Sequence, residues 1–214
     1  MARLLVINPN SNAEVTANIA RALLPWQATG VQIDCLTNQA GPDTISSNED
    51  VERAGMDVCR LAATSRADAI LVACFSDPGV DRLREQTQRP VFGIQEAAIL
   101  TALARAPRYG IIALSEHAVP RHLARIAQLQ LMQRCAGEVG LSGYGALAVG
   151  QSEAAYAETL AAADVLRGRG AGAVILGCAG FGPRRAALET ALGMPVIDPV
   201  LAGAALAVGA LLSA

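Results

Sequence analysis

The chain has 214 residues, 52% of them hydrophobic and only 3% aromatic, and a formal net charge of −2. This charge balance offers no basic stripe for nucleic acid, so we expect no nucleic-acid partner. All 17 basic residues are arginine, which excludes the lysine Schiff base of a pyridoxal phosphate enzyme. The length fits one large domain or two small ones, and the aliphatic composition is typical of parallel α/β proteins.

Short aliphatic runs alternate with helical segments along the whole chain. Strands are predicted over residues 3–7, 31–37, 90–94, 108–114 and 146–149, in the runs before Cys74 and Cys178, and from Pro195. Helices are predicted over residues 13–24, 49–65, 96–105, 119–135 and 153–167, from Asp77-Pro78, after Cys178, and at the C-terminus. This alternation predicts an α/β fold with parallel sheets and with ligand loops at the carboxyl ends of the strands.

Neither end of the chain suggests a membrane or secreted protein. The first residues lack the charged region and apolar stretch of a secretory signal. The last apolar run, residues 200–212, is too short to span a bilayer and is expected to form a buried helix. Five cysteines without a disulfide framework then fit a reducing compartment, so we expect a cytoplasmic protein with no membrane partner.

Two segments of the chain match each other around a cysteine. Ala-Ile-Leu-Val-Ala-Cys74-Phe-Ser-Asp-Pro-Gly and Ala-Val-Ile-Leu-Gly-Cys178-Ala-Gly-Phe-Gly-Pro are each followed by a helical stretch and then by Pro-Val-Phe-Gly-Ile or Pro-Val-Ile-Asp-Pro. A repeat of this kind can place equivalent atoms on opposite sides of a pseudo-twofold axis. The repeat predicts two similar Rossmann-like subdomains with parallel sheets, residues 1–106 plus 196–214 carrying Cys74 and residues 107–195 carrying Cys178.

Both matching thiols end a buried strand and enter a turn that is expected to open a helix. Backbone N–H groups and the helix dipole stabilise a thiolate at such a position. Cys35, Cys59 and Cys135 are instead expected to be ordinary buried thiols in a strand, a helix and a helix end. The two histidines, His117 and His122, share one helix start without a nearby cysteine, so closely spaced zinc ligands have no sequence support.

Polar side chains gather after the predicted strands. They are Asn8, Asn10 and Ser11, then Ser76 and Asp77, then Gln95 and Glu96, then Ser115 and Glu116. Each of them is also the kind of residue that caps a helix, and Asp77 and Glu96 need no other reason in a first helical turn. Asn8-Pro-Asn-Ser is the strongest group, because it exposes several donors to which a small anion or amide can bind.

These motifs together resemble the aspartate/glutamate/hydantoin racemase superfamily, with hydantoin and allantoin racemases as the most similar branch. The resemblance rests on five segments across nearly the whole chain: Asn8-Pro-Asn-Ser, Gly41-Pro-Asp-Thr-Ile-Ser, Cys74-Phe-Ser-Asp-Pro-Gly, Gly93-Ile-Gln-Glu-Ala-Ala and Leu176-Gly-Cys-Ala-Gly. It implies two α/β subdomains with the active site in the cleft between them and no cofactor. The chain departs from the family at Ser76, where many hydantoin racemases have Asp, and at Ala113-Leu-Ser-Glu, where a threonine-rich turn is expected.

By the same resemblance Cys74 and Cys178 are the catalytic acid/base pair. The implied substrate contacts are Asn10, Ser11, Ser46, Ser76 and Ser115, together with the backbone of Phe75, Ser76, Ala179 and Gly180. One thiolate removes a proton next to a carbonyl and the opposite thiol returns one, while backbone amides stabilise the enolate. We expect a small-molecule substrate and a homo-oligomer.

Charge favours a neutral substrate. The loops after the first, third, fourth and fifth predicted strands hold no arginine, and Arg184 and Arg185 follow Pro183 at a helix start, where arginines are usually solvated. A hydantoin-type ring therefore fits better than aspartate or glutamate, whose carboxylates need a cation or a nest of N–H groups. Aspartate or glutamate racemisation, maleate cis-trans isomerisation, arylmalonate-type decarboxylation and a non-catalytic binding module remain alternatives.

Overall fold

The structure, a computed structural model, describes residues 1–213 and divides into two compact units. Unit 1 is Met1–Ala97 with the segment from Val200, and unit 2 is Ala98–Pro199. The boundary falls inside helix α4 (Ile94–Arg105), whereas the sequence placed it after this helix, near Ala106-Pro107. The predicted α/β class is confirmed, since each unit contains one four-stranded parallel sheet.

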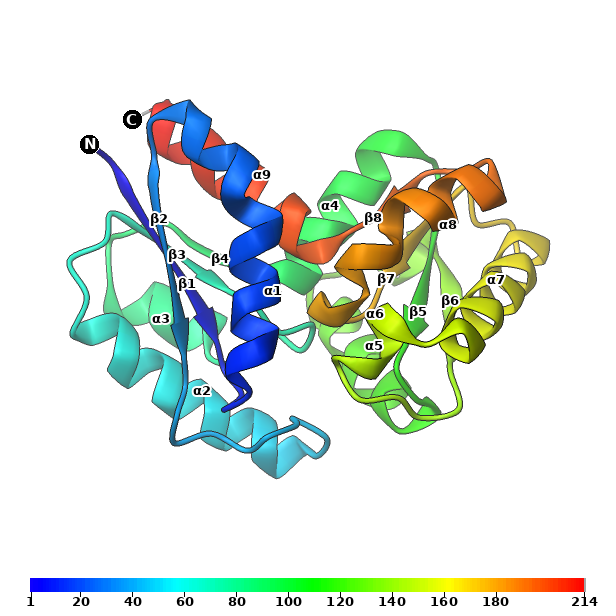
Figure 1. Cartoon of the computed structure of the whole chain (residues 1–214), viewed down its shortest axis with the longest axis horizontal. Helices are drawn as coiled ribbons and strands as arrows, with labels where there is room; N and C mark the ends of the chain where they lie inside the picture. Colours follow the sequence, from blue (N-terminus) through cyan, green and yellow to red (C-terminus); the bar gives the residue numbers. More distant parts are fainter. Residues whose placement is uncertain (214) are drawn as a thin grey trace. The chain divides into compact units, whose positions relative to one another are not determined.

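Unit 1 is a parallel sheet covered by helices on both sides (Figure 1). Its strands are β1 (Arg3–Asn8), β2 (Gln32–Thr37), β3 (Ala69–Val72) and β4 (Val91–Gly93), in the order β2-β1-β3-β4. Its helical elements are α1 (Ala13–Leu23), η1 (Leu24–Thr29), α2 (Asn48–Ala63), α3 (Val80–Gln86), the start of α4, and α9 (Pro199–Leu212) from Val200. Ile70 and Val72 pack in one cluster with Val58 of α2, whereas Leu71 lies beside Gly203 of α9. The apolar run that ends unit 1 is thus a helix packed on the sheet.

Unit 2 repeats this arrangement. Its strands are β5 (Tyr109–Ala113), β6 (Cys135–Gly140), β7 (Ala173–Leu176) and β8 (Val196–Ile197), in the order β6-β5-β7-β8. Its remaining helical elements are η2 (Glu116–Ala118), α5 (Val119–Gln128), η3 (Met132–Arg134), α6 (Ala148–Gln151), α7 (Glu153–Gly168), η4 (Ala179–Arg184) and α8 (Arg185–Leu192). The two strand orders correspond strand for strand, so β3 and β7 occupy equivalent places. The predicted repeat around the two cysteines is confirmed.

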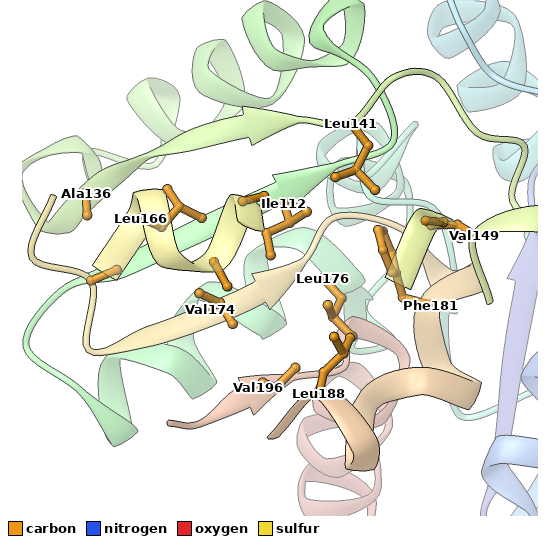
Figure 2. Packing of buried hydrophobic residues seen from close by; sticks show 14 residues of the cluster. Ile112, Ala136, Leu141, Val149, Leu166, Val174, Leu176, Phe181, Leu188 and Val196 are labelled. Carbon is orange, nitrogen blue, oxygen red and sulfur yellow. The ribbon is translucent and has the colours of Figure 1, made fainter. Parts of the chain in front are cut away.

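The strands that lead to the thiols are the centre of each unit. Every residue of β3 and of β7 is buried, as expected for the inner strands of a parallel sheet whose two faces are both covered. In unit 2, Figure 2 shows Ile112, Val174 and Leu176 of the sheet in one cluster with Leu166 of α7 and with Phe181, which follows β7. The segment after Cys178 is therefore anchored in the core.

Two predictions in unit 2 are wrong. The helix predicted over residues 119–135 ends at Gln128, because Gln130 takes a left-handed conformation with φ of 59°. Cys135 then begins β6 instead of ending a helix, and residues 146–149 lead into α6 instead of forming a strand. The pairing of β6 with β5 shifts its register between Tyr109 and Gly110, and Gly137 has a φ of 125°, so β6 lacks the regular alternation by which strands are found in sequence.

No helix among residues 1–213 is long and apolar enough to cross a membrane.

Candidate active site

Asparagines build the first loop at the carboxyl edge of the sheet in unit 1. The buried Asn8 donates from Nδ2 to Oδ1 of Asn10 at 2.9 Å and to Oγ1 of Thr16 at 3.0 Å. Oδ1 of Asn10 also accepts the backbone N–H of Asn12, whose own side chain caps α1. Because the Asn10 oxygen faces the loop, the group that it can offer a ligand is the amide NH₂.

A second loop pairs with the first. The N–H of Ser11 donates to the carbonyl of Pro42 at 3.0 Å, and Asn38 donates from Nδ2 to the carbonyl of Pro9 at 3.0 Å. Further along, Ser46 donates from its backbone and its hydroxyl to Asp50 at 3.0 and 3.1 Å. These bonds, with the capping box of Ser47, lower the pKa of Asp50 to about 2. The structure thus brings Asn10, Ser11 and the loop of Ser46 to one edge of unit 1.

Cys74 lies in the loop that follows β3 at this same edge. Its side chain and that of Ser76 are partly exposed, whereas Phe75 is only 3% exposed and packs inward. Phe75 can therefore contact a ligand only through its backbone. The predicted turn between Cys74 and a helix is confirmed, but the helix starts later than Asp77-Pro78, since residues 74–79 form bends and turns and α3 begins at Val80 with Gly79 as its N-cap.

Asp77 does not cap the helix that follows it. Its buried carboxylate accepts the N–H groups of Gln95 and Glu96, both at 2.9 Å, and so caps α4 instead. Asp77 has a φ of 45°, and its own N–H donates to the carbonyl of Cys74 at 2.9 Å. Sequence reasoning found the residue and its capping chemistry but assigned them to the wrong helix.

Cys178 does sit at a helix start, so the prediction is confirmed in unit 2. It is the N-cap of η4, and its Sγ accepts the N–H of Gly180 at 3.4 Å. A donor aimed at sulfur favours the thiolate over the thiol. Gly180 also packs so closely on the carbonyl of Ala146 that no Cβ would fit there. A donor held in this way is already oriented before a ligand arrives.

Ser115 follows β5 at the carboxyl edge of the sheet in unit 2. It is partly exposed and forms an isolated antiparallel bridge with Ser142. Glu116 beside it accepts the N–H of Gly140 at 2.9 Å. Because β5 and β7 are parallel neighbours, Ser115 and the loop of Cys178, Ala179 and Gly180 end at the same edge of this sheet.

The other three cysteines have raised pKa values. Burial raises the pKa of Cys35 to about 11 and also raises the pKa of Cys59 and of Cys135. Near neutral pH these three remain protonated, so they fit the structural role predicted for them. None of the five cysteines forms a disulfide with another described residue.

The two arginines after Cys178 are held by the protein. Arg184 donates to the carbonyls of Gly150 and Gln151 at 3.1 and 2.7 Å and stacks over Tyr156, with its Cζ 5.4 Å from the ring centroid. Arg185 forms an ion pair with Glu189 on the next turn of α8. Both guanidinium groups therefore have partners other than a ligand.

The two histidines lie in different environments. His117 is exposed, whereas His122 is buried with its Nδ1 2.6 Å from Oε1 of Glu138 on β6. The described residues contain no group of three or more His, Cys, Asp or Glu side chains that could hold a metal ion.

The two parallel α/β units have equivalent topology, and each carries a thiol after its third strand. The family described as Asp/Glu/Hydantoin racemase matches residues 4–207. A hydantoin racemase of Paenarthrobacter aurescens is 35% identical over 204 residues, which cover 92% of this chain and 86% of the relative.

Solved structures agree with the sequence comparison. Allantoin racemase from Pseudomonas fluorescens superimposes with a TM-score of 0.89 at 28% identity, over 99% of this chain and 91% of that one. Allantoin racemase from Klebsiella pneumoniae gives the same TM-score of 0.89 at 29% identity, over 100% and 88% of the two chains. The chain belongs to the Asp/Glu/hydantoin racemase family. As a racemase of this superfamily it is an isomerase.

Proposed function

We propose that this protein racemises hydantoin-type rings, either 5-substituted hydantoins or allantoin, by proton transfer between Cys74, Cys178 and one carbon atom next to a carbonyl. The observation that carries the proposal is the equivalence of the two thiols. Each follows the third strand of its sheet by the same offset, and each is partly exposed at the carboxyl edge. The similarity to a hydantoin racemase and to two allantoin racemases supports the choice of ring.

In the proposed reaction one cysteine starts as a thiolate and the other as a thiol. The thiolate sulfur takes the proton from the stereogenic carbon, and the electron pair of the broken C–H bond moves into the adjacent carbonyl to form an enolate. The other thiol then protonates the carbon from the opposite face. The protein ends with thiol and thiolate exchanged, so no oxidant, reductant or cofactor is consumed.

Backbone N–H groups beside each thiol are proposed to stabilise the enolate oxygen. The proposed donors are the N–H groups of Phe75 and Ser76 in unit 1 and of Ala179 and Gly180 in unit 2, and the Gly180 N–H also donates to the sulfur of Cys178. Preorganised donors of this kind are typically worth about 2.7–4 kcal/mol each in a transition state. Asn10, Ser11, Ser46 and Ser115 are proposed to bind the ring's carbonyl and N–H groups.

The charges around the thiols support a neutral ring over a free amino acid. An α-carboxylate is commonly held by a cation, and the two arginines near Cys178 are occupied by Glu153, Glu189 and backbone carbonyls. Amide and hydroxyl groups such as those of Asn10 and Ser11 match the carbonyls and N–H groups of a ring instead.

The test is to incubate the protein in deuterated water with single enantiomers of several 5-substituted hydantoins, allantoin, aspartate and glutamate, while following optical rotation and deuterium uptake. Samples without protein correct for spontaneous racemisation. Two-base transfer predicts that the newly formed enantiomer carries deuterium while the remaining substrate stays protiated at early times. If aspartate or glutamate has a higher kcat/KM than every ring compound, the charge argument is wrong. If no compound loses optical activity or exchanges its α-proton, the proposed function is wrong.

A further inference from the structure

The loop of Cys74 is tied to the helix after the next strand by one carboxylate. Asp77 is 5% exposed, and its two oxygens accept separate N–H groups from the first turn of α4. At 2.9 Å each, these are charge-assisted bonds at the positive end of a helix dipole. Because β3 and β4 are paired neighbours, this contact closes the loop across the end of the sheet.

The backbone of Asp77 and a glycine on β4 shape this contact. Asp77 has a φ of 45°, a left-handed conformation that Asp adopts more readily than most residues with a side chain. Gly93 makes room for the carboxylate, since a Cβ on Gly93 would overlap all three of its atoms. On the other side of the loop Gly79 packs on α2, where a Cβ would stand 2.6 Å from the carbonyl oxygen of Gly55.

In unit 2 a buried acid and a glycine also lie side by side at the corresponding place, with their positions exchanged. Gly93 pairs with Val72, and the residue that follows Ile197 in unit 2, and so stands opposite Leu176, is Asp198. Asp198 is 4% exposed, and its Oδ2 lies 3.0 Å from the position that a Cβ would take on Gly182. In unit 1 the acid is therefore on the thiol loop and the glycine on the strand end, whereas in unit 2 the glycine is on the loop and the acid on the strand end.

We propose that Asp77 and Asp198 are positioning residues, each of which locks a thiol loop onto the end of the neighbouring strand and so fixes the direction of Cys74 or Cys178. In both units an acid packs on a glycine between the thiol loop and the neighbouring strand end, although the acids do not correspond in sequence, and this recurrence supports a role for the packing itself. Because the Asp77 carboxylate is buried and binds two N–H groups of α4, Asp77 acts through Cys74 and not on a substrate. This role in catalysis rests on the proposed function, but the locking contact does not.

The test compares Asp77→Asn and Asp198→Asn with the matched control Asp81→Asn, an exposed aspartate on α3 whose side chain is 62% accessible. The first readout is the iodoacetamide alkylation rate of each thiol, measured by peptide mass spectrometry at alkaline pH, where the rate reports access to sulfur. We expect Asp77→Asn to accelerate alkylation of Cys74 about tenfold, because the loop loses one hydrogen bond to a charged group. The alkylation rate of Cys178 should stay unchanged. Asp198→Asn should do the reverse.

The second readout is the kcat for the ring compound that the wild-type protein racemises fastest. We expect each variant to lose about 100-fold in kcat with little change in KM, the cost of displacing a catalytic group by roughly 1 Å. The exchange variant Asp77→Gly/Gly93→Asp recreates in unit 1 the arrangement of unit 2. It should restore more activity than either single substitution.

Folded Asp77→Asn protein with wild-type Cys74 alkylation and wild-type kcat would overturn the proposal. If this variant does not fold, Gly93→Ala, which keeps the acid but displaces it, gives the same comparison with the same two outcomes. If the wild-type protein racemises none of the compounds, the proposed function fails while the alkylation rates still decide whether the contact positions the thiols.

Discussion

Removing the ring of Phe181 tests whether the core of unit 2 anchors the loop of Cys178. Phe181 is 0% exposed and lies in η4, three positions after the thiol. Figure 2 shows it in the cluster that contains Val149 and Leu176, which are 1% and 0% exposed. Phe181→Ala would leave a cavity among side chains from three elements, and such substitutions cost about 3–5 kcal/mol of unfolding free energy.

The expected result is a lower Tm in differential scanning calorimetry. Each kcal/mol shifts Tm by about 2–4 °C at this size, so Phe181→Ala should lower it by roughly 6–20 °C. The control is Val165→Ala on α7 of the same unit, where the side chain is 46% exposed and the expected change is within about 0.5 kcal/mol. If both variants melt within error of each other, the packing argument for η4 is refuted.

Three further results are expected. Cys74→Ala and Cys178→Ala should each abolish racemisation, while either variant retains exchange of the α-proton of one enantiomer; near-normal racemisation by either would contradict the two-base assignment. Activity should survive exhaustive dialysis against a chelator, and a loss that added metal restores would contradict the proposed chemistry. Asp50→Asn should cost about 1 kcal/mol, because it weakens the bonds that the Asp50 carboxylate contributes to the capping box of α2. Because the folded pKa of Asp50, about 2, lies below its ordinary value of 3.8, that cost should be complete above pH 3.8 and vanish as the pH falls through about 2. A Tm difference between wild type and Asp50→Asn that does not change with pH would show that the charge of Asp50 contributes nothing.

The repeat and most of its elements could be predicted because they depend on local patterns. The runs before Cys74 and Cys178 are continuous aliphatic strands, and each became a fully buried strand at the equivalent place in its sheet. Alternation of strands and helices then determines a parallel sheet, whose carboxyl edge collects the loops. The predicted role of Asn10 and Ser11 in a substrate site, in contrast, stays a prediction.

The errors share a physical cause, which is that long-range contacts override local propensity. Cys135-Ala-Gly-Glu-Val-Gly contains two glycines and an acid, a poor strand by composition, yet it pairs with β5 at the edge of the sheet. Its Glu138 is buried, and His122 of α5 lies 2.6 Å from the carboxylate. Nothing near Glu138 in the sequence marks this partner, so the strand could not be identified from its own residues.

Asp77 shows the same limit at the site itself. Asp-Pro before a helical segment is a sound local reason to expect a cap, and the carboxylate does cap a helix, but the helix is α4. If the two cysteine segments are aligned, no acidic residue corresponds to Asp77, because Cys178 is followed by Ala-Gly-Phe-Gly. The matching acid, Asp198, becomes visible only through the register of β7 and β8. Each thiol loop thus has a buried carboxylate beside it that comes from a different place in the chain, so internal repeats are better compared by the contacts around each loop than by residue identity.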